Sequence, residues 1–294
     1  MYETDRTDGL RRQVSDARSS GRSIGLVPTM GYLHEGHLRL IDAARSENEY
    51  VVCSVYVNPT QFGPNEDLDR YPRDLQKDRS LANEHGVDLL FVPSTETMYP
   101  NGPRAQYVWV DPGQLTQYLD GASRPGHFRG VATVVTKLFH MVQPDRAYFG
   151  QKDAQQAVVV QRMARDLAFP IEIRVVPTVR EEDGLALSSR NVYLSPEERL
   201  QAPALYHALR RTRAVIERGE RRVSRIEREM SSLIQQEAPS AHVDFIAVAD
   251  LQTLQPAGDL LPTEALIALA VYFGSTRLID NLMVRCGENR PEFQ

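Results

Sequence analysis

The sequence predicts an α/β protein in which a doubly wound parallel sheet is followed by a smaller C-terminal α+β domain. Up to about residue 176, short apolar runs alternate with longer amphipathic stretches, as in strands connected by helices. The run from Val51 to Val57 is apolar on both faces, which is typical of a parallel strand covered by helices on both sides. Beyond Asn191, two helical stretches are followed by three clustered apolar runs, which indicates a separate domain.

Hydrophobic periodicity locates the elements of the first domain. In the stretch 131–142, for example, Val131, Val135 and Leu138 share one side of a helix. The same reasoning predicts strands at 24–28, 51–57, 88–92, 146–149 and 171–176, and helices at 37–48, 75–84, 131–142 and 154–167.

The second domain opens with a helix start signal. Ser195 suits an N-cap and Pro196 the first helical position, which predicts one helical region running to about Gly219. The linker between the domains falls between Val176 and Asn191, and we place the domains at 1–180 and 181–294. Further elements are a helix at 224–237 and strands at 243–248, 265–272 and 278–284.

Composition disfavours several functions. The formal net charge is -5 and the pI is near 5.9, whereas a protein that holds nucleic acid usually needs a basic surface, so we expect no nucleic-acid partner. The N-terminus has no apolar signal core, and no apolar run approaches the roughly 20 residues that span a bilayer. We therefore expect a cytoplasmic protein without membrane contact.

Cys53 and Cys286 have no Cys-x-x-Cys partner, which predicts two buried, reduced thiols.

The most informative motif, Pro28 to His37, leaves a predicted strand through a glycine-containing turn and enters a helix. In an open α/β sheet, ligands bind at the carboxyl ends of the strands, and helix N-termini attract phosphates. His34 and His37 are three residues apart, so both can face one phosphate group and stabilise charge that develops on it. Gly36 lets a nucleotide approach the backbone closely.

Other interpretations of the two histidines stay open on this motif alone. A zinc-binding helix would read His-Glu-x-x-His, whereas this chain has His-Glu-x-His without a third ligand nearby, so we predict no metal site in the protein. Two ordinary turn histidines are the stronger alternative. The chain lacks the Gly-x-Gly-x-x-Gly fingerprint of nicotinamide enzymes and the P-loop of many kinases, which disfavours both classes.

A second motif follows the strand at 51–57. Asn58 and Gln61 are neutral hydrogen-bonding side chains suited to a small polar substrate, and Tyr71 could add a hydroxyl. A turn-rich loop without a binding role is the alternative.

A third motif follows the strand at 146–149. Lys152 can donate to a phosphate, Asp153 fits an N-cap, and Gln156 lies one turn after Lys152. The alternative is a plain capped helix with a solvated lysine. Because these three motifs all follow strands of one predicted sheet, we expect them to converge at its carboxyl edge.

Two loops add further candidates. In the segment 179–191, the hydroxyls of Ser188 and Ser189 and the guanidinium of Arg190 suit closure over a triphosphate. In the Gly/Pro-rich segment 120–130, Arg124 could meet an anion. An interdomain linker and a surface loop, respectively, are the alternatives.

Taken in order along the chain, these motifs resemble the pantothenate synthetase family. The first motif is also similar to the His-x-Gly-His signature shared by nucleotidylyl transferases and class I aminoacyl-tRNA synthetases, which implies a Rossmann-like first domain that binds ATP and pantoate and a C-terminal lid domain. The matching segments are Pro28–Gly31, His34–His37, Val57–Pro59, Gln61–Gly63, Phe149–Gly150, Lys152–Asp153, Gln155–Gln156, Leu187–Asn191 and Thr276–Asn281.

The resemblance implies a reaction and its components. Pantoate, β-alanine and ATP would give pantothenate, AMP and pyrophosphate through a pantoyl adenylate, with Mg²⁺ accompanying ATP and the enzyme acting as a homodimer. Many members of the family have glutamate where Gln151 stands, and we expect a modest effect at most.

The resemblance also implies roles for individual residues. His37 would be the main catalytic donor, supported by His34 and Lys152. The implied ATP-binding residues are Met30, Gly31, His34, Gly36, His37, Gly150, Lys152, Asp153, Val179, Leu187, Ser188, Ser189 and Arg190, and the implied substrate-binding residues are Gln61, Gln156, Asn58, Tyr71 and Arg124.

Two rival functions follow from the same residues. A nucleotidylyl transferase of the same fold would transfer a nucleotide to a phosphorylated acceptor and would not use an amine. A nucleotide-binding module without turnover would make no pantothenate at all.

Overall fold

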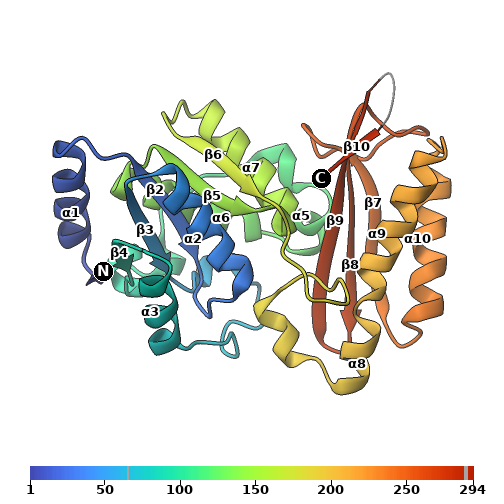
Figure 1. Cartoon of the computed structure of the whole chain (residues 1–294), viewed down its shortest axis with the longest axis horizontal. Helices are drawn as coiled ribbons and strands as arrows, with labels where there is room; N and C mark the ends of the chain where they lie inside the picture. The colour runs from blue at the N-terminus through green and yellow to red at the C-terminus, as the bar shows by residue number, and fades with distance from the viewer. Residues whose placement is uncertain (65, 288–290) are drawn as a thin grey trace. The chain divides into compact units, whose positions relative to one another are not determined.

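The computed structural model describes residues 1–64, 66–287 and 291–294 (Figure 1). These residues form two compact units, each with its own hydrophobic core. The main boundary, after Val176, lies close to the predicted division at residue 180. The first unit comprises Met1–Pro112, Arg124–Gln151 and Val159–Val176, and the second comprises Gly113–Ser123, Lys152–Val158 and Pro177–Gln294.

Two short segments thus belong to the second unit although the sequence-based division places them in the first. Hydrogen bonds explain why these segments cluster together, because the side chain of Gln155 donates to the carbonyls of Leu115 and Tyr118 and accepts from the N–H of Gly121. The assignment of binding and lid roles to the two parts of the chain stays a prediction.

A parallel sheet forms the centre of the first unit. Its strands are β1 (Tyr2–Thr4), β2 (Ile24–Thr29), β3 (Tyr50–Val55), β4 (Leu89–Phe91), β5 (Arg146–Gly150) and β6 (Glu172–Val176). Their order is β1-β4-β3-β2-β5-β6, and all pairs are parallel. The chain winds outwards from β2 in both directions, so the doubly wound prediction is confirmed, and all carboxyl ends lie at one edge.

Helices cover both faces of this sheet (Figure 1). The longer ones are α1 (Thr7–Ser19), α2 (Glu35–Glu47), α3 (Leu75–Glu84), α6 (His127–Val142) and α7 (Ala154–Asp166), of which α7 begins in a segment of the second unit. Short turns are η1 (Pro59–Gln61), α4 (Thr95–Met98), η2 (Pro103–Ala105) and η4 (Gln151–Asp153).

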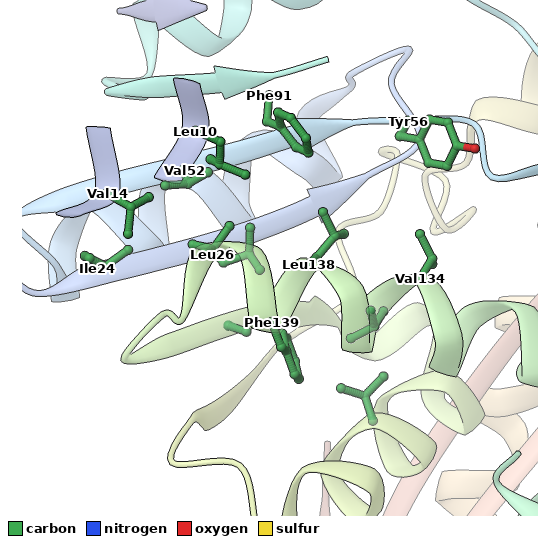
Figure 2. Close-up of a cluster of buried hydrophobic side chains, with 14 of the residues drawn as sticks. Leu10, Val14, Ile24, Leu26, Val52, Tyr56, Phe91, Val134, Leu138 and Phe139 are labelled. Carbon is green, nitrogen blue, oxygen red and sulfur yellow. The ribbon is translucent and has the colours of Figure 1, made fainter. Parts of the chain in front are cut away.

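Alternation along the strands builds the two cores of the first unit. Leu26 and Val52 pack with residues of α1 and α6, whereas Val27 and Val51 pack with residues of α2 and α3. Figure 2 shows the first of these cores, in which Leu138 of α6 belongs to the same buried cluster as Leu26. The apolar character of these strands on both faces follows from this double cover.

The N-terminal strand and helix are absent from the sequence-based prediction. Helix α1 buries only Leu10, Val14 and Ala17, and its other residues are predominantly polar. Its three buried positions at i, i+4 and i+7 mark one helix face. That narrow stripe is the signal that would have identified the helix.

An antiparallel sheet forms the second unit. Its strands are β7 (His242–Asp250), β8 (Glu264–Phe273), β9 (Thr276–Cys286) and β10 (Pro291–Phe293), in the order β10-β9-β8-β7. Its helices and turns are η3 (Gly113–Thr116), α5 (Asp120–Ser123), η5 (Ser189–Tyr193), α8 (Pro196–Gln201), α9 (Ala204–Glu217) and α10 (Val223–Glu237). Residues of α9 and α10 share one core with the sheet, which confirms the predicted α+β class.

The predicted continuous helix from Ser195 to Gly219 is wrong in one respect, because it is two helices. Ser195 caps α8 as predicted, and its hydroxyl accepts from the N–H of Glu198 at 3.2 Å. The break falls at Pro203, immediately before α9. Proline has no N–H for the hydrogen bond to the residue four positions earlier, and its ring crowds that carbonyl.

The two cysteines differ in burial. Cys53 is fully buried in β3, and burial raises the pKa of its thiol to about 12. Cys286 is only partly buried, which corrects the prediction of two buried thiols. Neither forms a disulfide.

Candidate active site

The backbone that leaves β2 makes a turn that requires glycine at position 31. Gly31 has a φ of 82°, and a Cβ there would lie 2.8 Å from Cγ1 of Val55 and 2.9 Å from Oδ2 of Asp78. Tyr32 follows with a φ of 52°, which non-glycine residues rarely adopt. The hydroxyl of Thr29 accepts from the N–H of Gly31 at 3.1 Å. These contacts set the direction in which the chain enters α2.

Asp78 of α3 holds this turn from the side. Its carboxylate accepts hydrogen bonds from the N–H groups of Tyr32 at 2.9 Å and Leu33 at 2.7 Å. The residue is 1% exposed. Burial raises the pKa of its carboxyl above the ordinary value, against the two backbone hydrogen bonds, which lower it. The side chain therefore provides acceptors for two backbone donors that tightly packed surroundings would otherwise leave unsatisfied.

The sequence-based prediction does not include Asp78. Its only signal is that Asp78 and Ala82, four residues apart, are the buried positions of α3. An acidic residue on the apolar stripe of a helix needs a partner, but the stripe does not say which backbone groups that partner supplies.

His34 and His37 cap α2 reciprocally. Nδ1 of His34 accepts from the N–H of Gly36 at 3.2 Å, and Nδ1 of His37 accepts from the N–H of His34 at 3.3 Å. Their ring centroids are 4.0 Å apart. A neutral imidazole that accepts at Nδ1 carries its hydrogen on Nε2. Each histidine therefore stabilises the turn and carries its ring hydrogen on Nε2, at the positive end of the helix dipole.

Gln61, in the turn η1 after β3, lies beside the first motif. Its Nε2 donates to Sδ of Met30 at 3.1 Å, and its Oε1 accepts from Nδ2 of Asn58 at 3.2 Å. Gln61 is 8% exposed. The predicted convergence of the first two motifs at the carboxyl edge of the sheet is therefore found in the first unit.

Asn58 is enclosed by this loop. Its Nδ2 also donates to the carbonyl of Gly130 at 3.2 Å, and its Oδ1 accepts from the hydroxyls of Tyr99 and Thr60, both at 2.9 Å. The side chain is 1% exposed and all its polar atoms are engaged. We interpret Asn58 as a residue that positions Gln61, in contrast to the expectation that its amide faces a substrate.

The start of α6 packs directly on the same loop. A Cβ at Gly130 would lie 2.3 Å from the carbonyl oxygen of Thr60, so only glycine permits this approach. Nη2 of Arg124 donates to the carbonyl of Gln61 at 3.3 Å. Nδ1 of His127 is 2.7 Å from the same oxygen. The predicted segment 120–130 therefore reaches the Gln61 loop through its last part.

Arg124 is paired with Glu66. Its Nε and Nη2 donate to the two carboxylate oxygens, both at 2.7 Å. Burial would raise the pKa of Glu66, but the hydrogen bonds and charge of Arg124 outweigh it and hold the pKa below its ordinary value. The cation predicted to meet an anionic ligand thus already has an anionic partner.

Tyr71, another predicted substrate residue, is buried with its ring edge-to-face against Phe62, and the two ring centroids are 5.8 Å apart.

The third motif continues from β5 into the second unit. A Cβ at Gly150 would meet no atom within 4 Å. The Nζ of Lys152 is 3.6 Å from Oδ1 of Asp153. Gln155 is buried in the hydrogen bonds to the segment 113–123, whereas Gln156 is only partly buried. Of the two adjacent glutamines, Gln156 is therefore the one whose side chain can serve a ligand.

The segment 179–191 is a short hairpin that ends in a 3-10 turn. The N–H of Leu187 donates to the carbonyl of Val179 at 3.0 Å, and Arg180 pairs with Ala186 in an isolated bridge. The hydroxyl of Ser188 caps η5 by accepting from the N–H of Arg190 at 3.2 Å. The segment in which we expected the linker between the domains thus has regular hydrogen bonding.

The predicted site residues divide between the two units. The first unit holds Met30, Gly31, His34, Gly36, His37, Asn58, Gln61, Tyr71, Arg124 and Gly150, and the second holds Lys152, Asp153, Gln156, Val179, Leu187, Ser188, Ser189 and Arg190.

Within the part of the chain that the structure describes, no three His, Cys, Asp or Glu side chains gather as a metal site. No helix of the same residues is long and apolar enough to cross a membrane.

A family model for pantoate-beta-alanine ligase matches residues 3–283. The chain belongs to the pantoate–β-alanine ligase family. It is 57% identical over 279 residues to a pantothenate synthetase of Moorella thermoacetica, covering 95% of this chain and 97% of that protein. It is 54% identical over 284 residues to a pantothenate synthetase of Geobacillus thermodenitrificans, covering 97% and 96%.

Solved structures of such ligases share the fold over nearly the whole chain. The pantothenate synthetase of Thermus thermophilus matches with a TM-score of 0.88 and 52% identity, covering 96% of this chain and 98% of that one. The pantoate-beta-alanine ligase of Francisella tularensis matches with a TM-score of 0.76 and 35% identity, covering 96% and 97%. That structure is described as a complex with beta-gamma ATP and β-alanine.

Proposed function

We propose that this ligase condenses pantoate with β-alanine, using ATP, and forms pantothenate, AMP and pyrophosphate through an enzyme-bound pantoyl adenylate. Membership of the ligase family supports the overall reaction. The observation that carries the assignment within this chain is the contact between Gln61 and Met30, because it puts a buried amide for a small substrate next to the histidine turn.

In the first step, a carboxylate oxygen of pantoate attacks the α-phosphorus of ATP, and the bond from that phosphorus to the pyrophosphate oxygen breaks. No covalent protein nucleophile is needed, so positioning and charge stabilisation carry the catalysis. We assign phosphate binding to His34 and His37, with Nε2–H of His37 as the main donor to the departing pyrophosphate. The amide of Gln61 would orient pantoate.

We assign supporting roles to residues of the second unit. Lys152 would donate to a phosphate, Asp153 would accept from the ribose, and Gln156 would bind pantoate. Val179, Leu187 and the segment Ser188–Arg190 would contact the nucleotide. Capping by Ser188 supports this role, since it keeps the backbone of the segment in one conformation.

In the second step, the amine of β-alanine attacks the acyl carbon of the adenylate. The bond between that carbon and the AMP oxygen breaks, and the amine loses a proton as the amide forms. A buried adenylate would be protected from water until the amine arrives.

We propose that Mg²⁺ enters with ATP, mainly on the phosphate oxygens, as is usual for Mg²⁺ in nucleotide sites. When bound, it would offset charge on the leaving pyrophosphate.

We also propose that the protein is a cytoplasmic homodimer. Sedimentation equilibrium of the purified protein tests the number of subunits directly.

Pyrophosphate exchange into ATP is the decisive assay. Exchange should require pantoate but not β-alanine, and AMP should be released only after β-alanine is added. A nucleotidylyl transferase would show exchange without dependence on pantoate. Absence of pantothenate at saturating ATP, Mg²⁺, pantoate and β-alanine would overturn the assignment in favour of a binding module.

A further inference from the structure

The segment Thr276–Asn281 of β9 matches the family resemblance but has no role in the proposed reaction. Four of its side chains, those of Thr276, Arg277, Asp280 and Asn281, are polar and lie in the second unit with little exposure. Arg277 forms an ion pair with Asp120 at 2.6 Å, which holds the segment 113–123, and a second one with Asp244 of β7 at 2.8 Å. Asp280 and Asn281, 3% and 5% exposed, reach two different segments.

Asn281 holds the backbone of Lys152. Its Nδ2 donates to the carbonyl oxygen of Lys152 at 2.9 Å. This bond joins residues 129 positions apart in the sequence, both within the second unit. A hydrogen bond to the main chain fixes where the Lys152 side chain begins without engaging its ammonium group.

Asp280 holds the hairpin that carries Ser188–Arg190. Its carboxylate accepts from both Nη atoms of Arg180, at 2.6 and 3.0 Å. Nη1 of Arg180 also donates to the carbonyl of Gly184 at 3.1 Å, and the guanidinium lies 4.4 Å from the ring centroid of Tyr206. The pair therefore connects β9 to the first arm and the turn of the hairpin.

The two anchors are coupled to one another. Oδ1 of Asp280 also accepts from the N–H of Asn281 at 2.8 Å. Two consecutive residues of one strand thus hold two segments to which we assign ATP contacts. A strand in the middle of an antiparallel sheet is a rigid support, so the distance between the two held backbones is fixed.

We propose that Asp280 and Asn281 are positioning residues that set the spacing between Lys152 and the Ser188–Arg190 segment for binding of the ATP phosphates. This proposal rests on the proposed function. Neither side chain touches substrate in this scheme, and both act through the residues they hold.

The test measures KM for ATP and KM for pantoate separately in the pantoate-dependent exchange assay. Asn281→Ala and Asp280→Asn should each raise KM for ATP about tenfold or more, because misplacement of a binding group by about 1 Å can cost up to about 100-fold. KM for pantoate should change less than about threefold, since neither Asp280 nor Asn281 holds Gln61, and Gln156 lies one helical turn beyond Lys152.

Two control variants separate positioning from loss of stability. Asn48→Ala removes a similarly buried amide, 4% exposed, that donates to the carbonyl of Ala44 at 2.9 Å in the first unit. Arg285→Ala changes a residue of β9 itself and removes an exposed ion pair with Glu264 of β8. Both should keep the wild-type KM for ATP even where the melting temperature falls. Asn281→Ser serves as a milder variant if Asn281→Ala does not fold.

The outcomes distinguish the two proposals. Wild-type protein without pantoate-dependent exchange would overturn the proposed function. Active wild-type protein combined with an unchanged KM for ATP in the Asn281 and Asp280 variants would overturn only the positioning role. An increase in KM for ATP that Asn48→Ala reproduces would likewise assign Asn281 to stability alone.

Discussion

The histidine turn of the first unit and the Ser188–Asn191 segment of the second are held in place by different kinds of contact. The turn is held mainly through its backbone, with N–H groups bonded to Asp78 and to the two histidine rings. The segment is held through side chains, including the Arg180–Asp280 ion pair and the amide of Asn191, which donates to Glu181 at 3.0 Å.

This difference predicts how each region responds to substitution. Asp78 holds the N–H groups of Tyr32 and Leu33 from another helix, so replacement of one histidine leaves these two contacts in place. Chemistry and support can therefore be altered separately in the turn. In the second region, removal of one partner leaves a charge or amide without compensation, which usually costs more than the net value of the contact. The Asp280→Asn variant described above tests the second region. The following variants test the turn and the adjacent Gln61 loop, starting with the largest expected effect.

Replacement of His37 by asparagine should lower turnover by about 10- to 1,000-fold, judged from removal of single donors at comparable sites. The asparagine Oδ1 can still accept from the N–H of His34, whereas the Nε2–H donor is lost. Turnover in the complete assay, compared with the melting temperature, measures the effect.

The turn should remain folded in this variant, so its melting temperature should stay close to that of wild type. Near-normal turnover would remove His37 from the catalytic assignment. A collapse in stability together with turnover would mean that the cap, and not the donor, is what His37 provides.

Asp78→Asn should lower turnover by up to about 100-fold through displacement of the histidine turn. An amide has only one acceptor oxygen and points N–H groups at one of the two backbone donors. The loss of one buried hydrogen bond should also reduce the free energy of unfolding by about 1–3 kcal/mol. Steady-state kinetics and urea denaturation measure the two effects.

Asp145→Asn is the matched control, because Oδ2 of Asp145 accepts from the N–H of Ile24 at 2.6 Å, at the opposite end of β2. It should reduce stability without a comparable loss of turnover. Equal losses of turnover in the two variants would show that Asp78 contributes only to folding.

Gln61→Ala should raise KM for pantoate about 10- to 100-fold, since a hydrogen bond to a charged group contributes about 1.5–3 kcal/mol. KM for ATP should change much less. Equal weakening of both substrates would contradict the assignment of Gln61 to pantoate and would make its contact with Met30 a structural feature.

The smallest expected effect concerns pH and the Glu66–Arg124 pair. The pKa of Glu66 is lowered in the folded state, so its stabilising contribution is present above the unfolded pKa of about 4.3 and is lost as pH falls through the folded value. Glu66→Gln should therefore reduce stability by about 1 kcal/mol at pH 7.

Thermal unfolding of both proteins from pH 7 to pH 3 measures this dependence. The difference between them should shrink as pH falls below about 4. A constant difference over that range would mean that the charge of Glu66 does not stabilise the Gln61 loop.

Local patterns predicted much of the fold correctly. Helix α3 has the predicted bounds, and strands β2 to β9 lie within a few residues of the predicted ranges, whereas the short strands β1 and β10 were not predicted. Proline at position 203 was overlooked within an otherwise helical pattern, and the polar composition of α1 concealed its three buried residues. In both cases the average composition of the segment gives the wrong prediction, because one proline or three buried apolar residues determine the local structure.

By itself, the sequence determined the element types, the strand-end position of the motifs and the family. The first two depend on neighbours within a few turns of the chain, where periodicity and capping act, and the family follows from the resemblance of the motifs. Only the tertiary structure identified Asp78, Asp280 and Asn281 as supports, because their partners lie 46, 100 and 129 positions away. A buried polar side chain reveals in the sequence that it needs a partner, but packing alone decides which one it meets.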